Sequence, residues 1–386
     1  MRSRGLGSAL VDTDVLIVGG GLAGLSIAHQ LDRSGRDWRL VEARDRLGGR
    51  VRSVTSRADP TPEDRYDLGP SWFWHGQPLM ARLVEDLGLS VFEQHSAGRF
   101  VMQDGDGAVR SDFDFAPMAG SLRLAGGMTS LIDALARRVP GYRVAIGHAV
   151  THLRFTGDGI RVAVVHSGGR IEITARQVVL ALPPRLAARA ITFTPALSSA
   201  QMSAMRTIPT WMAGHAKLVA IYPTPFWRET GLSGDGMSRC GPLLEIHDAS
   251  PASAAAGALF GFVGVAPQER RGVAEALIEA SIAQLSAMFG PEATSPLDVL
   301  FEDWASDTHT ATSDDHVRVN HHPTYGMPDL LADLWNGRLV LGSTEMAPIH
   351  GGLLEGALEA AGAAILALGP PGRHPGPPAR TIRDAK

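Results

Sequence analysis

Cysteine is almost absent from this sequence: Cys240 is the only one among 386 residues. A single cysteine excludes an internal disulfide and is typical of a protein kept in a reducing compartment, so we expect a cytoplasmic protein. An excess of basic residues is also missing, because 36 lysines and arginines face 40 aspartates and glutamates, for a formal net charge of −4. This balance argues against a nucleic-acid partner, which would need a basic surface.

Long apolar runs are absent as well. No stretch approaches the about 18 consecutive apolar residues that cross a bilayer, so we expect no membrane-spanning helix and no membrane partner. The first 13 residues contain two arginines but no apolar core, which is not the pattern of a secretory signal. An apolar fraction of 44% is nevertheless ordinary for a folded chain. The length allows about two domains.

One stretch near the start organises the chain. Residues Val15–Val18 are four consecutive apolar residues, three of them β-branched, which predicts a buried strand. Gly19, Gly21 and Gly24 then form the pattern G-x-G-x-x-G, and residues 22–31 are predicted to form a helix. In dinucleotide-binding domains the first glycine allows a tight turn, the second lets the backbone approach a pyrophosphate, and the third lets helix and strand pack closely. The helix N-terminus offers free N–H groups to the phosphates.

An acidic residue follows at a suitable distance. A second predicted strand, residues 38–41, ends at Glu42, about twenty residues after the glycines, where an acid binds a ribose hydroxyl. Arg44, Gly49 and Arg50 come next and suit a long bound dinucleotide, because arginine pairs with phosphate oxygens in a bidentate way. From these residues alone, a strand-turn-helix that binds no ligand remains open.

The run E-x-R-x-R-x-G-G-R at residues 42–50 resembles the FAD-binding segment of the flavin amine oxidase superfamily. This superfamily includes monoamine, polyamine and L-amino-acid oxidases, with phytoene desaturases and protoporphyrinogen oxidases as wider relatives. The resemblance implies FAD as the cofactor. It also implies an α/β fold, in which an FAD-binding Rossmann-like domain of the GR2 type carries an inserted α+β substrate domain.

The resemblance runs from Val15 to about residue 368 and is strongest at both ends. Residues 67–69 match a segment that passes beside the isoalloxazine ring in the family, and residues 351–357 match its closing glycine motif. Pro70 stands where the family often has glycine, and it removes one N–H donor. The match implies that FAD is contacted by Gly19, Gly21, Leu22, Ala23, Gly24, Glu42, Ala43, Arg44, Gly49, Arg50, Gly69, Pro70, Ser71, Trp72, Val150, Trp304, Gly342, Glu345, Gly352, Leu353, Leu354 and Ala357.

The same resemblance implies a discontinuous domain organisation. We expect the FAD-binding domain to comprise residues 14–70, 121–187 and 299–368, and the substrate domain to comprise residues 71–120 and 188–298. Residues 1–13 are expected to be a flexible N-terminus, and the Gly/Pro-rich and then charged residues 369–386 a disordered tail.

Lys217 is the candidate catalytic residue. It is the one charged residue in an otherwise apolar predicted strand, residues 214–221. A lysine among apolar neighbours needs a partner or a depressed pKa, which favours a role in a site. It also matches the family's lysine, which holds a water against flavin N5. The alternative is a lysine that extends from a strand edge into solvent.

The resemblance implies oxidation of an amine to an imine, with hydride transfer to flavin N5 and reoxidation by O2 to give H2O2. The expected partners are a small amine and O2, and a homodimer is possible. Two alternatives remain open: an FAD-dependent desaturase or oxidase of a hydrophobic substrate that is not an amine, and a catalytically inert FAD-binding protein.

Several details distinguish this sequence from the family that it resembles. Monoamine oxidases place two tyrosines before the flavin, and Leu353 stands at one of those positions, while Tyr325 is a weak candidate for the other. We therefore expect the apolar part of a substrate to be positioned against Trp72 or Trp74. Some members link FAD to a cysteine, but Cys240 lies in the expected substrate segment, so no cysteinyl link is expected.

A metal site is not expected. The candidates would be His309, His316, His321 and His322, which have no convincing helical spacing and no neighbouring cysteines. We interpret them as solvated loop residues.

Local patterns predict three further features. Residues 143–146, 150–155, 160–166 and 170–174 are expected to be short antiparallel strands. Residues 268–289 are expected to form one long helix, and residues 91–109 a hairpin with its turn at residues 104–107.

Overall fold

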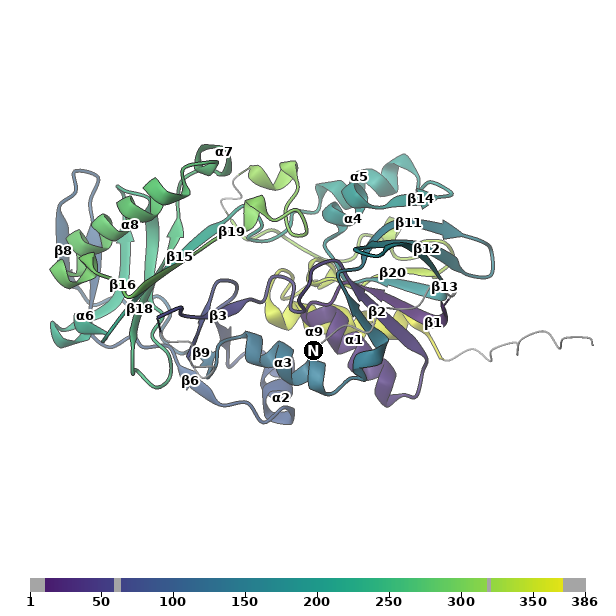
Figure 1. The fold of residues 1–386 in the computed structure, drawn as a ribbon, viewed down its shortest axis with the longest axis horizontal. Coiled ribbons are helices and arrows are strands. Elements are labelled where there is room, and N and C mark those ends of the chain that lie inside the picture. The colour runs from purple at the N-terminus through teal and green to yellow at the C-terminus, as the bar shows by residue number, and fades with distance from the viewer. Residues whose placement is uncertain (1–10, 59–63, 318–320, 371–386) are drawn as a thin grey trace, which may run out of the picture.

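The computed structural model describes residues 11–58, 64–317 and 321–370. Two sheets lie at opposite ends of the longer axis of the molecule (Figure 1). Chain segments far apart in the sequence contribute to each of them. In the described part of the chain, no helix is long and apolar enough to cross a membrane.

The first sheet has eight strands in the order β10-β2-β1-β13-β12-β11-β14, with β20 paired to β13. Strand β1 pairs in parallel with β2 and with β13, β10 pairs in parallel with β2, and β20 pairs in parallel with β13. Strand β12 is antiparallel to both of its neighbours, β11 and β13. The strands are β1 (Val11–Val18), β2 (Trp38–Glu42), β10 (Val144–Ile146), β11 (Ala149–Phe155), β12 (Ile160–His166), β13 (Gly169–Leu180), β14 (Thr192–Thr194) and β20 (Leu339–Leu341).

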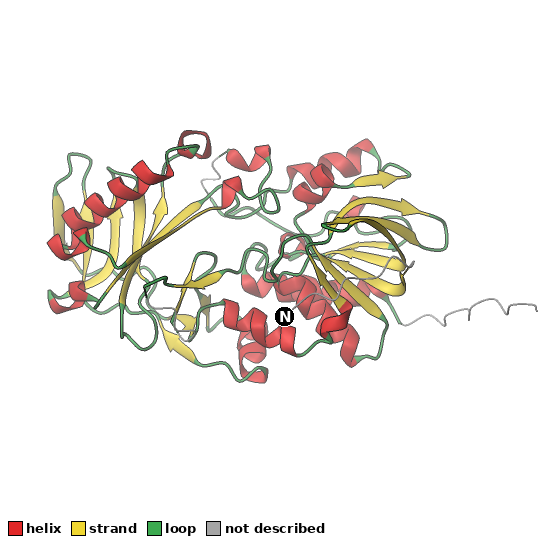
Figure 2. Ribbon diagram, viewed as in Figure 1, coloured by secondary structure: helices red, strands yellow, loops and turns green. Residues whose placement is uncertain are grey.

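Helices cover both faces of this sheet (Figures 1 and 2). On one face α1 (Leu22–Arg33), α3 (Thr129–Arg137) and α9 (Leu354–Leu368) share an apolar core with alternate residues of β1. On the other face, α4 (Pro184–Ala190) and α5 (Ser199–Thr207) pack against the remaining strand residues. This is a mixed sheet between two layers of helices, parallel around β1 and the glycine turn, and the predicted fold class is confirmed.

The second sheet has seven strands in the order β19-β15-β18-β17-β16-β7-β8. They are β7 (Arg99–Gln103), β8 (Val109–Phe113), β15 (Ala216–Tyr222), β16 (Leu232–Ser238), β17 (Leu243–Asp248), β18 (Gly257–Val263) and β19 (Asp298–Asp303). Helix α8 (Ala274–Phe289) packs on the face that carries Leu218 and Ala220. Because side chains alternate along a strand, Lys217 and Val219 point to the opposite face, where Val219 packs with Tyr66 and Leu68.

Shorter elements connect these layers. The strands are β3 (Ser53–Thr55), β4 (Arg65–Asp67), β5 (Phe73–Trp74), β6 (Val91–Glu93) and β9 (Ser121–Leu124), and the helices are α2 (Pro78–Asp86), α6 (Phe226–Glu229) and α7 (Pro267–Arg270). Six 3₁₀ turns complete the described elements: η1 (Gly141–Arg143), η2 (Pro291–Thr294), η3 (Trp304–Ser306), η4 (Ser313–His316), η5 (Asp329–Leu331) and η6 (Thr344–Met346).

The strand predictions are corrected in two places. Residues 144–146 form β10 parallel to β2, where an antiparallel strand was expected, because they pair with the free edge of the parallel sheet. The turn at residues 104–107 does join two strands, β7 and β8, but β6 leaves this hairpin and pairs with β9.

The predicted helix 268–289 is divided into α7 and α8. Gly272 takes a positive φ of 74° between them, and the Arg270 side chain is bound by Asp303. The chain therefore turns here instead of continuing one helix.

The sheets also differ from the expected domain boundaries. Residues 11–13 belong to β1, where a flexible segment was expected, because they pair with β13. Strand β14 lies in the first sheet, although it was expected in the substrate domain. Strand β19 lies in the second sheet, although residues from 299 onward were expected in the FAD-binding domain. The rest of the expected flexible N-terminus, residues 1–10, and most of the expected tail, residues 371–386, lie outside the described residues.

Gly24 sets how closely α1 approaches β1. A Cβ atom at this position would lie 1.9 Å from the carbonyl oxygen of Gly19, which no real contact allows. We therefore expect Gly24→Ala to lower the free energy of unfolding by about 1–3 kcal/mol, measured by urea denaturation.

Gly362→Ala is the matched control. A Cβ at Gly362, inside α9, would meet no atom within 4 Å. There the same substitution should stabilise the helix by about 0.5–1 kcal/mol. Equal effects of the two substitutions would contradict the packing role of Gly24.

Candidate active site

A cavity of about 750 Å³ lies between the two sheets, and residues from both line it. It brings together most of the predicted site residues: Gly19, Gly21, Leu22, Ala23, Glu42, Arg44, Gly49, Arg50, Gly69, Pro70, Ser71, Trp72, Lys217, Trp304, Gly352, Leu353, Leu354 and Ala357. The size is within the usual range for a ligand pocket, and one continuous space joins the glycine turn to Lys217.

Glu42 is held rigidly at one end of the cavity. Its side chain accepts hydrogen bonds from the backbone N–H groups of Gly20 (2.7 Å) and Arg44 (2.8 Å), one on each oxygen. Each carboxylate oxygen can accept a further hydrogen bond, as a ribose hydroxyl requires. Glu42 is therefore able to accept a hydrogen bond from a ribose hydroxyl, and its contact with the cofactor stays a prediction.

Arg44 and Arg50, which were expected near phosphates, already bind acidic residues. Arg44 Nη2 lies 2.8 Å from Asp307 Oδ2, and Arg50 Nη1 lies 2.8 Å from Glu345 Oε1. A guanidinium has five N–H donors, so both side chains keep donors for a phosphate while these ion pairs fix their positions.

The glycine turn fits the FAD that the resemblance implies. The N-terminus of α1 begins after Gly21 and has no side-chain cap, so its N–H groups are available to an anion. A Cβ at Gly21 would meet only the carbonyl oxygen of Gly48, at 3.7 Å, so this side of the turn is open. Ser343 Oγ lines the same cavity and has no hydrogen-bond partner among the described residues.

Lys217 lies on β15, an inner strand of the second sheet, and is buried, with 2% of the residue exposed. Its Nζ donates to Ser71 Oγ (2.7 Å) and to the carbonyl oxygen of Gly69 (3.2 Å), and lies 3.8 Å from the centroid of the Phe260 ring. Strand β15 has a neighbour on both sides, so this lysine does not extend from a strand edge.

Burial lowers the pKa of Lys217 from 10.5 to about 7. Asp67 opposes this shift and Arg123 adds to it. Burial also raises the pKa of the Asp67 carboxyl, which accepts hydrogen bonds from Ser53 Oγ and from the Met128 N–H. The lysine can therefore gain or lose a proton near neutral pH.

The aromatic residues around Leu353 differ from the expectation. Leu353 lines the cavity as predicted, but Tyr325 does not, and its hydroxyl donates to the carbonyl oxygen of Pro209. Trp211 lines the wall instead, packed against Gly352, where an added Cβ would lie 3.0 Å from Trp211 Cβ. Trp72 and Trp74 both line the cavity, in agreement with the prediction of an aromatic wall.

Five predicted cofactor residues do not line the cavity: Gly24, Ala43, Val150, Gly342 and Glu345. Gly24 packs α1 against the carbonyl oxygen of Gly19. Gly342 packs against Val179, whose Cγ1 would lie 2.9 Å from a Cβ added at position 342. Val150 is 8% exposed and pairs with Val164 inside the first sheet. Glu345 forms an ion pair with Arg50, which itself lines the cavity. For these residues a direct contact with the cofactor stays a prediction.

Other cavity residues were missed from the sequence. They include Gln77, Trp211, His215, Glu245, Phe262 and Arg270. Three of the histidines interpreted above as solvated loop residues, His309, His316 and His322, also line the cavity. One signal was present in the sequence: Glu245 and His247 are two residues apart in a strand, which places both on one face.

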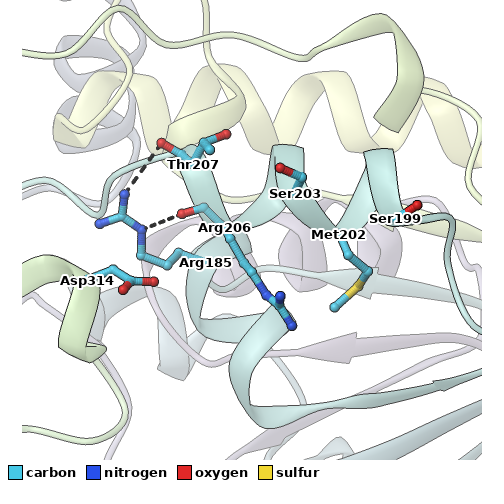
Figure 3. Close-up of a pocket in the computed structure, with 7 residues that line it drawn as sticks. All are labelled: Arg185, Ser199, Met202, Ser203, Arg206, Thr207 and Asp314. Carbon is cyan, nitrogen blue, oxygen red and sulfur yellow. Dashed lines mark hydrogen bonds between the residues drawn. The ribbon is translucent and has the colours of Figure 1, made fainter.

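A second, more open depression of about 520 Å³ contains none of the predicted site residues (Figure 3). Arg185 crosses it and donates to the carbonyl oxygens of Arg206 and Thr207, while its Nη1 binds Asp315 Oδ1 at 2.5 Å. These contacts tie α4, α5 and η4 together, so Arg185 has a structural role.

Comparison with known proteins gives consistent results. The family model "Flavin containing amine oxidoreductase" matches residues 22–119 and 107–364. A putative flavin-containing monoamine oxidase, AofH, of Mycobacterium tuberculosis is 26% identical over 76% of this chain and 83% of its own length. The putrescine oxidase of Kocuria rosea is 26% identical over 81% of this chain and 87% of its own length.

Solved structures show the same fold. A structure of putrescine oxidase bound to putrescine has a TM-score of 0.75 at 21% identity and covers 93% of this chain and 99% of its own. Cyclohexylamine oxidase from Brevibacterium oxydans has a TM-score of 0.74 at 18% identity and covers 92% and 98%.

The pKa of Lys217 predicts how stability depends on pH. The folded-state pKa of about 7 is below the ordinary 10.5, so between these values the unfolded chain binds more protons. Stability should therefore rise with pH across this window. We expect Lys217→Met, which cannot titrate, to lose this rise, so its stability relative to wild type should fall by about 1–2 kcal/mol between about pH 7 and pH 9 in urea titrations.

Leu218→Met controls for the new methionine, because Leu218 lies on the same strand but faces α8. Its pH dependence should match that of the wild type. Parallel pH profiles for Lys217→Met and wild type would show that Lys217 does not titrate in this range.

Proposed function

We propose that this chain, which belongs to the flavin-containing amine oxidoreductase family, oxidises the carbon–nitrogen bond of a small amine to an imine. As a member of this family it is an FAD-dependent oxidoreductase. FAD bound in this cavity would supply the redox chemistry, a two-electron oxidation of the carbon–nitrogen bond in which amine and O2 give imine and H2O2.

The observation that carries the proposal is the continuity of one cavity from the glycine turn to Lys217. Gly21 and the N-terminus of α1 would hold the pyrophosphate, and Glu42 a ribose hydroxyl. Lys217 would then lie at the flavin end, where its Nζ is fixed by Ser71 and by the carbonyl oxygen of Gly69. A pKa of about 7 allows it to hold a water or exchange a proton there.

The names of the relatives support an amine as the substrate, since they include monoamine oxidase and putrescine oxidase. The cavity wall opposite the nucleotide end is largely apolar and aromatic, with Trp72, Trp74 and Phe262. Such a wall positions the carbon chain of an amine by dispersion contacts and excludes water from the reacting carbon.

The direct test is peroxide release by the purified, FAD-loaded protein over primary, secondary and polyamine substrates and amino acids. We expect peroxide with at least one class of amine. Lys217→Met should keep its FAD but slow flavin reduction or reoxidation in stopped-flow traces. Turnover of polyenes alone would instead support a desaturase, and a yellow protein without turnover would support an inert FAD-binding protein.

Gly21→Val tests the nucleotide end of the cavity. The valine side chain would occupy the space that the pyrophosphate needs. It would not clash with the protein, because a Cβ at position 21 meets only the carbonyl oxygen of Gly48, at 3.7 Å. We expect a folded protein that has lost most of its FAD, measured by absorbance of the purified protein and by reconstitution. The control is Gly105→Val, in the β7–β8 turn, where no atom lies within 4 Å of an added Cβ. Full flavin content in Gly21→Val would contradict the placement.

Leu353 predicts weak oxidation of benzylamine. A leucine lacks the π face of a tyrosine, so a cation–π contribution of about 0.5–2 kcal/mol is lost at this wall. Leu353→Tyr should therefore raise kcat/KM for benzylamine relative to longer aliphatic amines. High wild-type turnover of benzylamine that Leu353→Ala leaves unchanged would show that this position does not select substrates.

A further inference from the structure

Glu245 lines the same cavity as Lys217, and its strand, β17, lies two strands away from β15 in the second sheet. Lys217 pairs with Phe262, and Phe262 pairs with Glu245, so the three residues form one row across β15, β18 and β17. All three line the cavity. Because adjacent strands lie about 4.8 Å apart, the Cα atoms of Lys217 and Glu245 are about 10 Å apart.

A buried histidine holds Glu245 in place. His247 Nε2 lies 2.8 Å from Glu245 Oε1, and His247 Nδ1 lies 2.8 Å from Asp235 Oδ1. The side chains of His247 and Asp235 are fully buried, whereas 38% of the Glu245 side chain is exposed. Since a carboxylate only accepts hydrogen bonds, an imidazole between two carboxylates donates from both nitrogens and is cationic.

With both acids ionised, the three groups together carry one net negative charge, because one imidazolium lies between two carboxylates. Burial lowers the pKa of His247, but its hydrogen bonds to both acids outweigh this effect and raise it. The hydrogen bond from His247 lowers the pKa of Glu245, although burial opposes it, while burial raises the pKa of Asp235. The negative charge is therefore held most firmly on Glu245, the acid that reaches the cavity.

The second oxygen of this carboxylate, Oε2, has no hydrogen-bond partner among the described residues. Glu245 Oε1 accepts from His247, but Oε2 accepts no hydrogen bond from any described residue. Two cationic side chains that line the same cavity are engaged elsewhere: Lys217 donates to Ser71, and Arg270 binds Asp303. The His247 imidazolium is shared between two carboxylates and contacts only Oε1 of Glu245, so a cationic ligand group at Oε2 would add a favourable charge interaction on the cavity side.

We propose that Glu245 binds a second cationic group of the substrate, so that the protein selects short linear diamines over monoamines of the same length. The reacting amine would lie near Lys217, the methylene chain over Phe262, and the distal ammonium at Glu245 Oε2. His247 and Asp235 are positioning residues that fix the direction and charge of Glu245. This inference rests on the proposed amine oxidation and specifies its substrate class.

The test compares putrescine with n-butylamine, which has the same carbon chain and one amine fewer. Binding is measured by calorimetry on the anaerobic protein with its FAD chemically reduced, so that neither amine is oxidised. Turnover is measured as kcat/KM from peroxide release. Glu245→Gln keeps an acceptor for His247 and removes the charge. The control, Glu279→Gln, makes the same change at an exposed position of α8.

We expect Glu245→Gln to weaken binding of putrescine and lower its kcat/KM by about 10- to 100-fold, the range for a lost charged hydrogen bond, while both values for n-butylamine stay within about twofold. Glu279→Gln should change neither amine. Equal losses for the two amines, or no loss for putrescine, would overturn the inference. Retained FAD and n-butylamine turnover show that the variant is folded.

Two further variants separate position from charge. Glu245→Asp keeps the charge but withdraws it by one methylene, so the preference should shift from putrescine toward the longer cadaverine. Asp235→Asn leaves a neutral pair of His247 and Glu245 and should reduce the preference for putrescine without changing n-butylamine turnover. An unchanged preference in both variants would contradict the arrangement.

The failure of this inference is distinct from failure of the proposed function. A wild-type protein that oxidises n-butylamine and putrescine equally well, with no effect of Glu245→Gln, overturns the diamine preference alone. A wild-type protein that oxidises no amine overturns amine oxidation and this inference together.

Discussion

A buried lysine joins the two halves of the molecule. Lys217 belongs to the second sheet, but its Nζ donates to Ser71 and to the carbonyl oxygen of Gly69, in the loop that follows β4. A charged amine away from water is costly unless each of its donors finds a partner. The position of this loop, and with it the flavin end of the cavity, is therefore coupled to the register of β15. Trp304 holds the same loop from another side, through a 2.9 Å hydrogen bond from Nε1 to the carbonyl oxygen of Leu68.

The nucleotide end depends on contacts between the two ends of the chain. Helix α9 packs beside α1, and its Glu355 accepts the N–H groups of Leu79 and Met80 at the start of α2. Arg36, which follows α1, donates to the carbonyl oxygen of Gly369 at 3.0 Å and to Gln177 Oε1 at 2.6 Å. These long-range contacts explain how motifs more than three hundred residues apart border one cavity.

The substrate end is organised by strand register. Antiparallel pairing places Lys217, Phe262 and Glu245 side by side on three neighbouring strands. An amine, an apolar ring and a carboxylate therefore follow one another along this row. The hydrogen bonds of His247 to Glu245 and Asp235 add a fixed charge to this row. Trp72 packs edge-on against His247, with ring centroids 5.0 Å apart, and so links the charged cluster to the aromatic wall.

The nucleotide end could be predicted from the sequence because it depends on local chemistry. Gly19, Gly21 and Glu42 belong to a short strand-turn-helix-strand unit, and their spacing alone indicates the role of each. Lys217 was recognisable because a lone charge in an apolar strand requires a partner. Gly24 was predicted to permit close packing, and the structure shows the contact that an added Cβ would violate.

The substrate end was decided only by the tertiary structure. Glu245 and Trp211 come from segments without a motif, and they reach the cavity through strand pairing and loop packing over long sequence distances. Long-range strand pairing also explains why β10, β14 and β19 have neighbours that local sequence patterns did not predict. By itself, the sequence determined the glycine turn with its flanking strand and helix, because backbone conformation and apolar periodicity act over a few residues. The tertiary structure decided which strands became neighbours, because pairing energy depends on residues distant in the chain.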